Sequence, residues 1–260
     1  MADSASPEIL RLLSDPLRWQ LVGELGRSDR RVGELVELTG KPQNLVSYHL
    51  AECRRAGIVR SRRSSADGRD VYYSADMFRC RDLLADTGRA LHPGLLLAPA
   101  PPRDVTVRRG RVRLLFLCTG NSARSQIAEA LVTHHSKGMV DAQSAGSHPK
   151  PLHPDALRVM AERGIDIAGH ESKPLSRFAA RRFDRVITLC DKVREVCPEF
   201  RGAALTSHWS IADPAAGPAA DPSNGGAIRN AFNDVAGEIE RRVELLLADL
   251  HVTPTVPVTS

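Results

Sequence analysis

The stretch "LLFLCTGNSARSQIAEAL", residues 114–131, changes character in its middle. Its first half is an apolar run that predicts a buried strand, and its last half has the spacing of a helix. A short loop of small and polar residues lies between them, beginning at Cys118 and ending at Arg124. This order of strand, loop and helix is typical of an α/β fold with a parallel sheet.

The chain downstream of this stretch continues the alternation. Strand-like runs are predicted at 112–117 and 185–189, and helix-like runs at 125–136, 154–163 and 227–250. Strands that alternate with helices in this way favour a parallel sheet covered by helices.

The length of 260 residues suits two domains rather than one. The stretch "LHPGLLLAPAPPRDVTVRRG" at 91–110 is rich in proline and cannot sustain a helix. We therefore expect a first domain at 1–95, a linker at 96–110 and a second domain at 111–252.

Composition narrows the class of protein. No run approaches the roughly 20 apolar residues of a membrane span, and the N-terminal residues do not resemble a secretory signal. The five cysteines are widely spaced, which suits a reducing compartment. We expect a soluble cytoplasmic protein. A net charge of +5 is compatible with nucleic acid, phosphate or another anion and does not choose among them.

The first domain has a helical pattern throughout until about residue 57. Within it, "RRVGELVELTGKPQNLVSYHLAECRRAGIV" predicts a short helix at 31–38, a Thr-Gly turn and a second helix from Pro42, a helix-turn-helix. Leu45, His49 or Leu50, and Cys53 have the spacing of an inward face. The second helix of such a unit lies in the major groove, so its early polar residues are candidate DNA contacts: Gln43, Asn44, Ser47 and Tyr48.

A polar Asp-Gly turn in "GIVRSRRSSADGRDVYYSAD" predicts a β-hairpin after the second helix. Its arginines would bind phosphate and make affinity depend on salt. These arginines are Arg60, Arg62, Arg63 and Arg69.

Residues 6–90 resemble the arsenical-resistance repressor family of dimeric winged helix-turn-helix regulators, through "LSDPLRWQLVGEL", "VSYHLAECRRAGIV" and "GRDVYYSAD". The resemblance implies a homodimer that binds operator DNA. Family members often sense metals or metalloids through cysteines in the first helix of the motif, and "VGELVEL" has none. Cys53 and Cys80 are the candidate sensor thiols, and the alternative is that both are small core residues.

The loop between Cys118 and Arg124 has the composition of an anion site. Small residues let successive backbone N–H groups point inward, and the helix behind adds its positive end. Such a setting favours a thiolate, which is the nucleophilic form of cysteine. Arg124 can bind two oxygens of a tetrahedral oxyanion. The alternative is a core cysteine near a surface arginine. The predicted oxyanion loop is Thr119, Gly120, Asn121, Ser122, Ala123, Arg124 and Ser125.

"LFLCTGNSARSQIAEAL" closely resembles the signature of the low-molecular-weight phosphatase fold and its arsenate reductase branch. The similarity continues through "SAGSHPKPLHPDALRVMAERGIDIAGHESKPL" and "DRVITLCD", over about 111–250. It implies a parallel four-stranded sheet flanked by helices, so the whole chain would be α/β, with a mostly α winged helix-turn-helix and its β-hairpin wing in front.

The same resemblance implies roles for single residues. Asn121 would hold a strained loop backbone, and Ser125 would hydrogen-bond the Cys118 thiolate. Asp213 in "HWSIADPA" would be the general acid, aimed with the help of Pro214. Asp-Pro is also a common turn pair, which is the alternative for Asp213.

The remaining thiols decide between phosphatase and reductase. Hydrolysis of a cysteinyl intermediate needs Cys118 alone, whereas reduction of arsenate needs a second thiol that leaves a disulfide. "ITLCDKVREVCPEF" resembles the redox segment of thioredoxin-coupled arsenate reductases. By that resemblance Cys190 attacks Cys118 and Cys197 resolves the bond, with thioredoxin or a small thiol as electron donor and no tightly bound cofactor. The alternative is a core cysteine followed by a helical one.

Two positions depart from the reductase pattern. Ala123 stands where many relatives carry another cysteine, and "HESKPL" does not match the polar residues that help bind potassium in some reductases. Asn121, Glu129 and Ser144 do sit at corresponding positions, so a potassium requirement is left open.

The two resemblances together indicate a repressor of an arsenic-resistance operon fused to an arsenate reductase that converts arsenate to arsenite. Two alternatives stay open. One is a protein tyrosine phosphatase fused to a DNA-binding domain, and the other is a regulator that uses the oxyanion pocket for sensing only.

Overall fold

The computed structural model describes residues 7–66, 68–92, 94–95, 111–196, 203–216 and 225–250. The chain divides into two compact units, residues 1–103 and 104–260. In the described ranges, no helix has both the length and the apolar character that crossing a bilayer demands.

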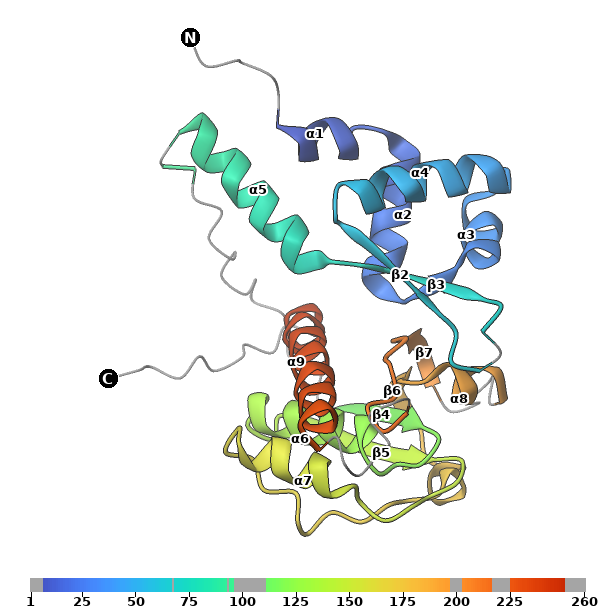
Figure 1. Ribbon diagram of the computed structural model, residues 1–260, viewed down its shortest axis with the longest axis vertical. Coiled ribbons are helices and arrows are strands. Elements are labelled where there is room, and N and C mark those ends of the chain that lie inside the picture. Colours follow the sequence, from blue (N-terminus) through green and yellow to red (C-terminus); the bar gives the residue numbers. More distant parts are fainter. Residues whose placement is uncertain are drawn as a thin grey trace. The chain divides into compact units, whose positions relative to one another are not determined.

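The N-terminal unit is helical with a small antiparallel sheet (Figure 1). Asp15 accepts hydrogen bonds from the backbone N–H groups of Leu17 and Arg18 and so caps the second helix, whose first residue is a proline. The elements are α1 (Glu8–Leu13), α2 (Pro16–Arg27), β1 (Arg30–Arg31), α3 (Val32–Thr39), α4 (Gln43–Arg55), β2 (Val59–Arg63), β3 (Val71–Ala75) and α5 (Met77–Leu91).

The helices α3 and α4 form the predicted helix-turn-helix. Gly40 ends α3 in the left-handed conformation, with φ 64°, which a glycine adopts without strain. Two expectations were wrong in detail. Leu45 is exposed and its neighbour Val46 is buried, because the inward positions of α4 follow the spacing 46, 49, 50 and 53. The region is also not helical throughout, since β1 pairs with β3 and gives the sheet the order β1-β3-β2.

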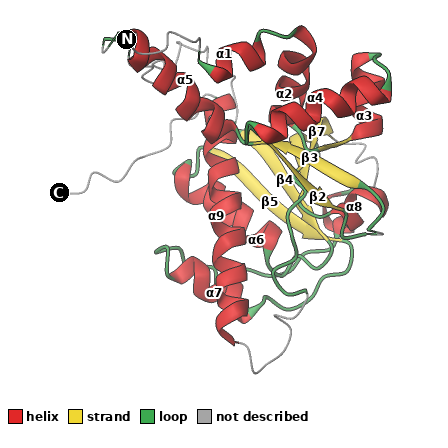
Figure 2. Ribbon diagram, turned by 45° about the horizontal axis from the view of Figure 1, so that its top comes forward, coloured by secondary structure: helices red, strands yellow, loops and turns green. Residues whose placement is uncertain are grey.

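The C-terminal unit contains a parallel four-stranded sheet with the order β5-β4-β6-β7 (Figure 2). Helices α6 and α9 lie side by side, with α7 packed against α9. The predicted α/β class is therefore confirmed. The elements are β4 (Val112–Cys118), α6 (Arg124–His135), β5 (Val140–Gly146), α7 (Pro154–Ala161), the 3-10 helix η1 (Leu175–Phe178), β6 (Phe183–Thr188), α8 (Asp191–Val196), β7 (Ala203–His208) and α9 (Gly225–Asp249).

The inner strand β4 explains the continuous apolar run at 114–117. Those four side chains are each no more than 1% exposed, because the strand is paired on both edges and covered on both faces. The carboxyl ends of β4, β5 and β6 meet at one edge of the sheet, where parallel α/β folds place their ligand sites. The chain leaves β4 at this edge through Cys118.

Candidate active site

The sulfur of Cys118 lies inside the turn that joins β4 to α6. The backbone N–H of Asn121 donates to it over 3.2 Å, and the hydroxyl of Ser125 lies 2.9 Å away. Cys118 is only 2% exposed. The helix α6 begins at Arg124, so its first N–H groups and its positive end face the loop.

The carbonyl groups of the loop are held by the segment that follows β5. His148, Lys150 and His153 donate their backbone N–H groups to the carbonyls of three loop residues, each over 2.9 Å. The accepting residues are Thr119, Gly120 and Ser122. These bonds turn the loop carbonyl oxygens toward residues 147–153. Carbonyl oxygens carry partial negative charge, so turning them away from the loop interior favours binding of an anion there.

Asn121 has φ 45°, a value that residues other than glycine rarely adopt. Its side-chain oxygen accepts from the backbone N–H of Lys173 over 2.7 Å and from the Gln126 amide over 3.1 Å. Its backbone carbonyl accepts from the Ser172 hydroxyl over 2.8 Å. The strained conformation is thus held from several sides.

Gly146 supports the loop from behind. A Cβ atom on this residue would lie 2.7 Å from the Thr119 carbonyl oxygen and 2.8 Å from the Asn121 nitrogen. The last residue of β5 therefore touches the loop with its backbone, which only glycine permits.

Arg124 joins the loop to the segment 211–213. Its guanidinium donates to the Ile211 carbonyl and to the Asp213 carboxylate, each over 3.0 Å. Arg124 is 6% exposed, whereas the Asp213 side chain is 42% exposed. The structure therefore brings the predicted acid beside the predicted anion-binding guanidinium, with one face of the carboxylate in solvent.

Cys190 follows β6 and is also brought to the loop. Its sulfur lies 3.3 Å from the Thr119 hydroxyl, and the residue is 1% exposed. Burial raises the pKa of the Cys190 thiol, while the Arg124 charge and the Thr119 hydroxyl oppose the rise and Cys118 adds to it. Two thiols therefore share the surroundings of one guanidinium. Cys197 lies outside the described residues.

A buried carboxylate next to Cys190 was missed by sequence reasoning. Asp191 opens α8 and is fully buried. Its Oδ1 lies 3.1 Å from Nε2 of His208 and accepts from the Ser210 hydroxyl over 2.8 Å. An Asp that follows a predicted strand is only a weak indication of a functional residue. The partners of Asp191 lie on and after β7, 17 and 19 residues away along the chain, so the sequence does not reveal them.

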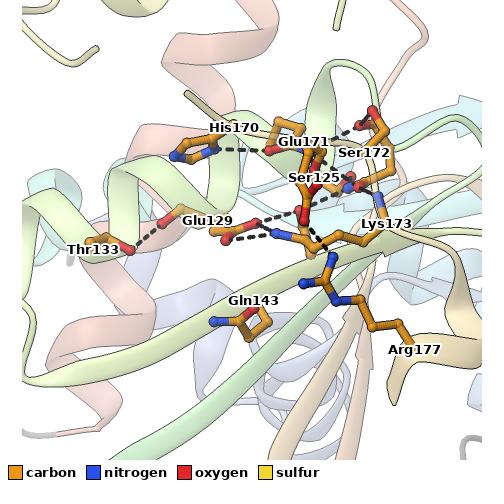
Figure 3. A network of polar contacts seen from close by, with 12 residues as sticks. Ser125, Glu129, Thr133, Gln143, His170, Glu171, Ser172, Lys173 and Arg177 are labelled. Carbon is orange, nitrogen blue, oxygen red and sulfur yellow. Dashed lines mark hydrogen bonds and ion pairs between the residues drawn. The ribbon is translucent and has the colours of Figure 1, made fainter. Parts of the chain in front are cut away.

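A second buried pair was also missed. The Lys173 ammonium lies 3.0 Å from both carboxylate oxygens of Glu129, inside the network drawn in Figure 3. The resemblance to arsenate reductases had grouped Glu129 with Asn121 and Ser144 at positions that correspond to potassium ligands. It gave no partner for Lys173, the lysine of "HESKPL".

The predicted DNA contacts on α4 are all exposed: Gln43, Asn44, Ser47 and Tyr48. In the wing, Arg63 and Arg69 are exposed and Arg62 is half-buried. Arg60 forms an ion pair with Asp76, which caps α5.

Cys53 and Cys80 are core residues of the N-terminal unit, 0% and 4% exposed. Burial raises the pKa of each thiol to about 11. Within the described residues, no three His, Cys, Asp or Glu side chains gather in an arrangement that could hold a metal ion.

Residues 113–254, more than half of the chain, match the family described as low molecular weight phosphotyrosine protein phosphatase. The chain belongs to this family. Residues 13–70 match the MarR family. The fusion of a helix-turn-helix domain with a low-molecular-weight phosphatase domain is thus confirmed, while the N-terminal match names the MarR family instead of the arsenical-resistance repressors.

Individual relatives of the phosphatase-family domain carry arsenate reductase names. The chain is 33% identical over 138 residues to a glutaredoxin arsenate reductase of Synechocystis sp., covering 53% of this chain and 98% of the relative. It is 32% identical over 131 residues to an arsenate reductase of Halalkalibacterium halodurans, covering 50% and 94%. A solved arsenate reductase in its phosphate-binding state has 32% identity and a TM-score of 0.45, covering 53% of this chain and 98% of that one. The two sequence relatives, each covered over more than nine-tenths of its length, make the family domain arsenate reductase-like.

Proposed function

We propose that the family domain is an arsenate reductase with Cys118 as its nucleophile. Three described observations support this assignment: the Asn121 N–H and the Ser125 hydroxyl at the Cys118 sulfur, the buried guanidinium of Arg124, and a second thiol at the same loop. The third observation carries the choice of reductase, because a phosphatase needs one thiol and reduction needs more.

The first step forms a bond between the Cys118 sulfur and arsenic and breaks an arsenic–oxygen bond. Arg124 and the loop N–H groups bind the remaining oxygens and stabilise their charge. Asp213, in its protonated form, gives that proton to the departing oxygen, which leaves as water, and Asp213 is left as the carboxylate.

The second step reduces arsenic. The Cys190 thiolate attacks the Cys118 sulfur, so a disulfide forms, and the electron pair of the broken sulfur–arsenic bond stays on arsenic, which leaves as arsenite. Cys197 then attacks the Cys190 sulfur and releases Cys118 as a thiolate. An external dithiol such as thioredoxin, or two equivalents of a small thiol, reduces the Cys190–Cys197 disulfide.

We assign the N-terminal domain to transcriptional repression by a homodimer that binds operator DNA in the cytoplasm. The exposed polar face of α4 and the arginines of the wing support this part. Arsenite produced by one domain would be the signal for the other. The burial of Cys53 and Cys80, which raises the pKa of each thiol to about 11, favours the alternative that both are core residues over the sensor role.

Trapping the relay tests the reductase. Cys197→Ser should complete about one turnover of arsenate and stall as a Cys118–Cys190 disulfide, found by mass mapping of the unreduced protein. Cys190→Ser should bind arsenate and release little arsenite. Cys118→Ser should neither form the sulfur–arsenic bond nor release arsenite. Steady turnover by Cys197→Ser without the Cys118–Cys190 linkage would exclude the relay.

Hydrolysis of an aryl phosphate distinguishes the reductase from the phosphatase alternative. If that function holds, Cys190→Ser and Cys197→Ser hydrolyse the ester at the wild-type rate while arsenate is not reduced by any variant. Tight operator binding with no turnover of either substrate would instead favour a regulator that uses the pocket for sensing.

A further inference from the structure

A buried ion pair lies behind the nucleophile loop and takes no part in the chemistry described above. Glu129 projects from the middle of α6 and Lys173 from the segment before η1, and the two side chains meet in Figure 3. They are 8% and 7% exposed. Burying two charges has a desolvation cost that their attraction often only balances, so stability alone is a weak reason for the pair.

Hydrogen bonds lead from this pair to the sulfur. The Ser144 hydroxyl donates to Glu129 Oε2. The Asn121 side-chain nitrogen donates to the Ser144 oxygen over 2.7 Å and to the Ser125 oxygen over 2.9 Å. Ser125 lies 2.9 Å from the Cys118 sulfur. Four side chains therefore separate the ammonium from the nucleophile.

The carboxylate sets the direction of these bonds at its end. An ionised carboxylate only accepts hydrogen bonds and a serine hydroxyl has one proton, so the proton of Ser144 points at Glu129. The Ser144 oxygen then accepts from Asn121. The amide of Asn121 is oriented for this, because its oxygen already accepts from the backbone N–H of Lys173 and from Gln126.

The same direction continues to the sulfur. Because the Ser125 oxygen accepts from Asn121, its single proton is available to Cys118. A thiolate is stabilised by a donor and a thiol much less, so this arrangement favours the charged sulfur.

Lys173 acts at two points of the chain of bonds, on Glu129 at its end and on Asn121 in its middle. Its backbone N–H orients the Asn121 amide and its ammonium neutralises Glu129. We propose that Lys173 is a positioning residue of the nucleophile loop: its buried ammonium keeps Glu129 ionised, and that charge makes Ser125 donate to the Cys118 sulfur. This inference rests on Cys118 being the nucleophile in the proposed function, and it holds for arsenate and for a phosphate ester alike.

The rate of Cys118 alkylation by iodoacetamide at pH 7, followed by peptide mass mapping in the full-length protein, tests the role. Lys173→Met removes the charge and should slow alkylation about 10- to 100-fold, the usual worth of a hydrogen bond to a charged group. Ser125→Ala should slow it to a similar degree. Arg185→Met removes the ion pair between Arg185 and Asp249, remote from the loop, and should leave the rate unchanged.

A second variant distinguishes the proposed role from misfolding, because Lys173→Met leaves a buried carboxylate without its cation and could destabilise the fold. The double variant Glu129→Gln with Lys173→Met has no buried charge and should keep the wild-type melting temperature. It should still alkylate slowly, because the introduced glutamine amide would donate as readily as accept and no longer fixes the direction of Ser144. A wild-type rate in this folded variant would overturn the inference.

Small cations give a further readout. Lys173→Ala leaves space for methylammonium or ammonium beside Glu129, and millimolar amounts of either should restore alkylation, whereas tetramethylammonium should not. A folded Lys173→Ala protein that neither cation restores contradicts the inference. If wild-type Cys118 itself reacts no faster at pH 7 than a free cysteine, the proposed function fails first, and the two failures are distinguishable.

Discussion

Gly146→Ala should inactivate the nucleophile loop with little change elsewhere in the fold. The added Cβ would lie 2.7 Å from the Thr119 carbonyl oxygen and 2.8 Å from the Asn121 nitrogen, and both atoms belong to backbone that cannot rotate away. Ordinary contact begins at 3.4 Å, so the loop must move by about 0.6 to 0.7 Å or β5 must retreat. Overpacking of this kind costs about 1–3 kcal/mol.

The displacement falls on the backbone of Thr119 and Asn121, and the Asn121 N–H is the group that donates to the Cys118 sulfur. A misplacement of about 1 Å lowers catalytic rates roughly 100-fold, so a shift of about 0.6 to 0.7 Å should lower turnover of arsenate by about 15- to 25-fold. We would measure kcat/KM together with the melting temperature. Gly169→Ala is the matched control, because no atom lies within 4 Å of its added Cβ. Near-normal kcat/KM in Gly146→Ala, with the control unchanged, would refute the claim that β5 supports the loop through bare backbone.

Three other outcomes follow from burial and charge. Burial raises the pKa of Cys190, and only its thiolate attacks. The rate of disulfide formation by Cys190 in a single turnover should therefore rise with pH, approaching tenfold per pH unit from about pH 7 to 8.5. A rate that does not change with pH would contradict this. Arg62→Ala with Arg63→Ala should weaken operator binding and reduce the slope of log affinity against log salt by about two, measured by fluorescence anisotropy; an unchanged slope would remove both from the phosphate contacts. Burial raises the pKa of Cys53 and Cys80 to about 11, so both thiols should resist iodoacetamide at pH 7.5 until urea unfolds the protein. The raised pKa favours the folded state only while the thiols are protonated. The free energy of unfolding should therefore fall as pH rises from about 9 to 11, and should fall less in the variant with Cys53→Ser and Cys80→Ser.

Much of the fold could be predicted because local patterns were strong. The apolar run before Cys118 and the Thr-Gly turn before Pro42 each have few alternative structures. The predicted linker at 96–110 lies outside the described residues. The inward face of α4 was placed one residue too early at Leu45, since a single leucine beside Val46 does not define the rotation of a helix. The two-residue strand β1 has no periodicity to detect.

The site was predictable where its residues are close in sequence and not where tertiary contacts assemble it. Cys118 and Arg124 lie on one loop, and the spacing of small residues between them already indicates an anion site. The partnership of Glu129 with Lys173 and that of Asp191 with His208 join side chains 44 and 17 residues apart. Hydrophobic patterning carries no information about such pairs, because each is a local exception to it.

The buried Asp191 gives α8 a fixed pivot. If this carboxylate left the interior, its contacts with the His208 imidazole and the Ser210 hydroxyl would both be lost, so the first turn of α8 is the end that stays in place. Any unwinding that the redox cycle requires must then start from the opposite end of this helix. Cys190, the residue before this fixed turn, is thereby held beside the Thr119 hydroxyl at the edge of the loop, the position from which its sulfur must reach Cys118 to form the disulfide.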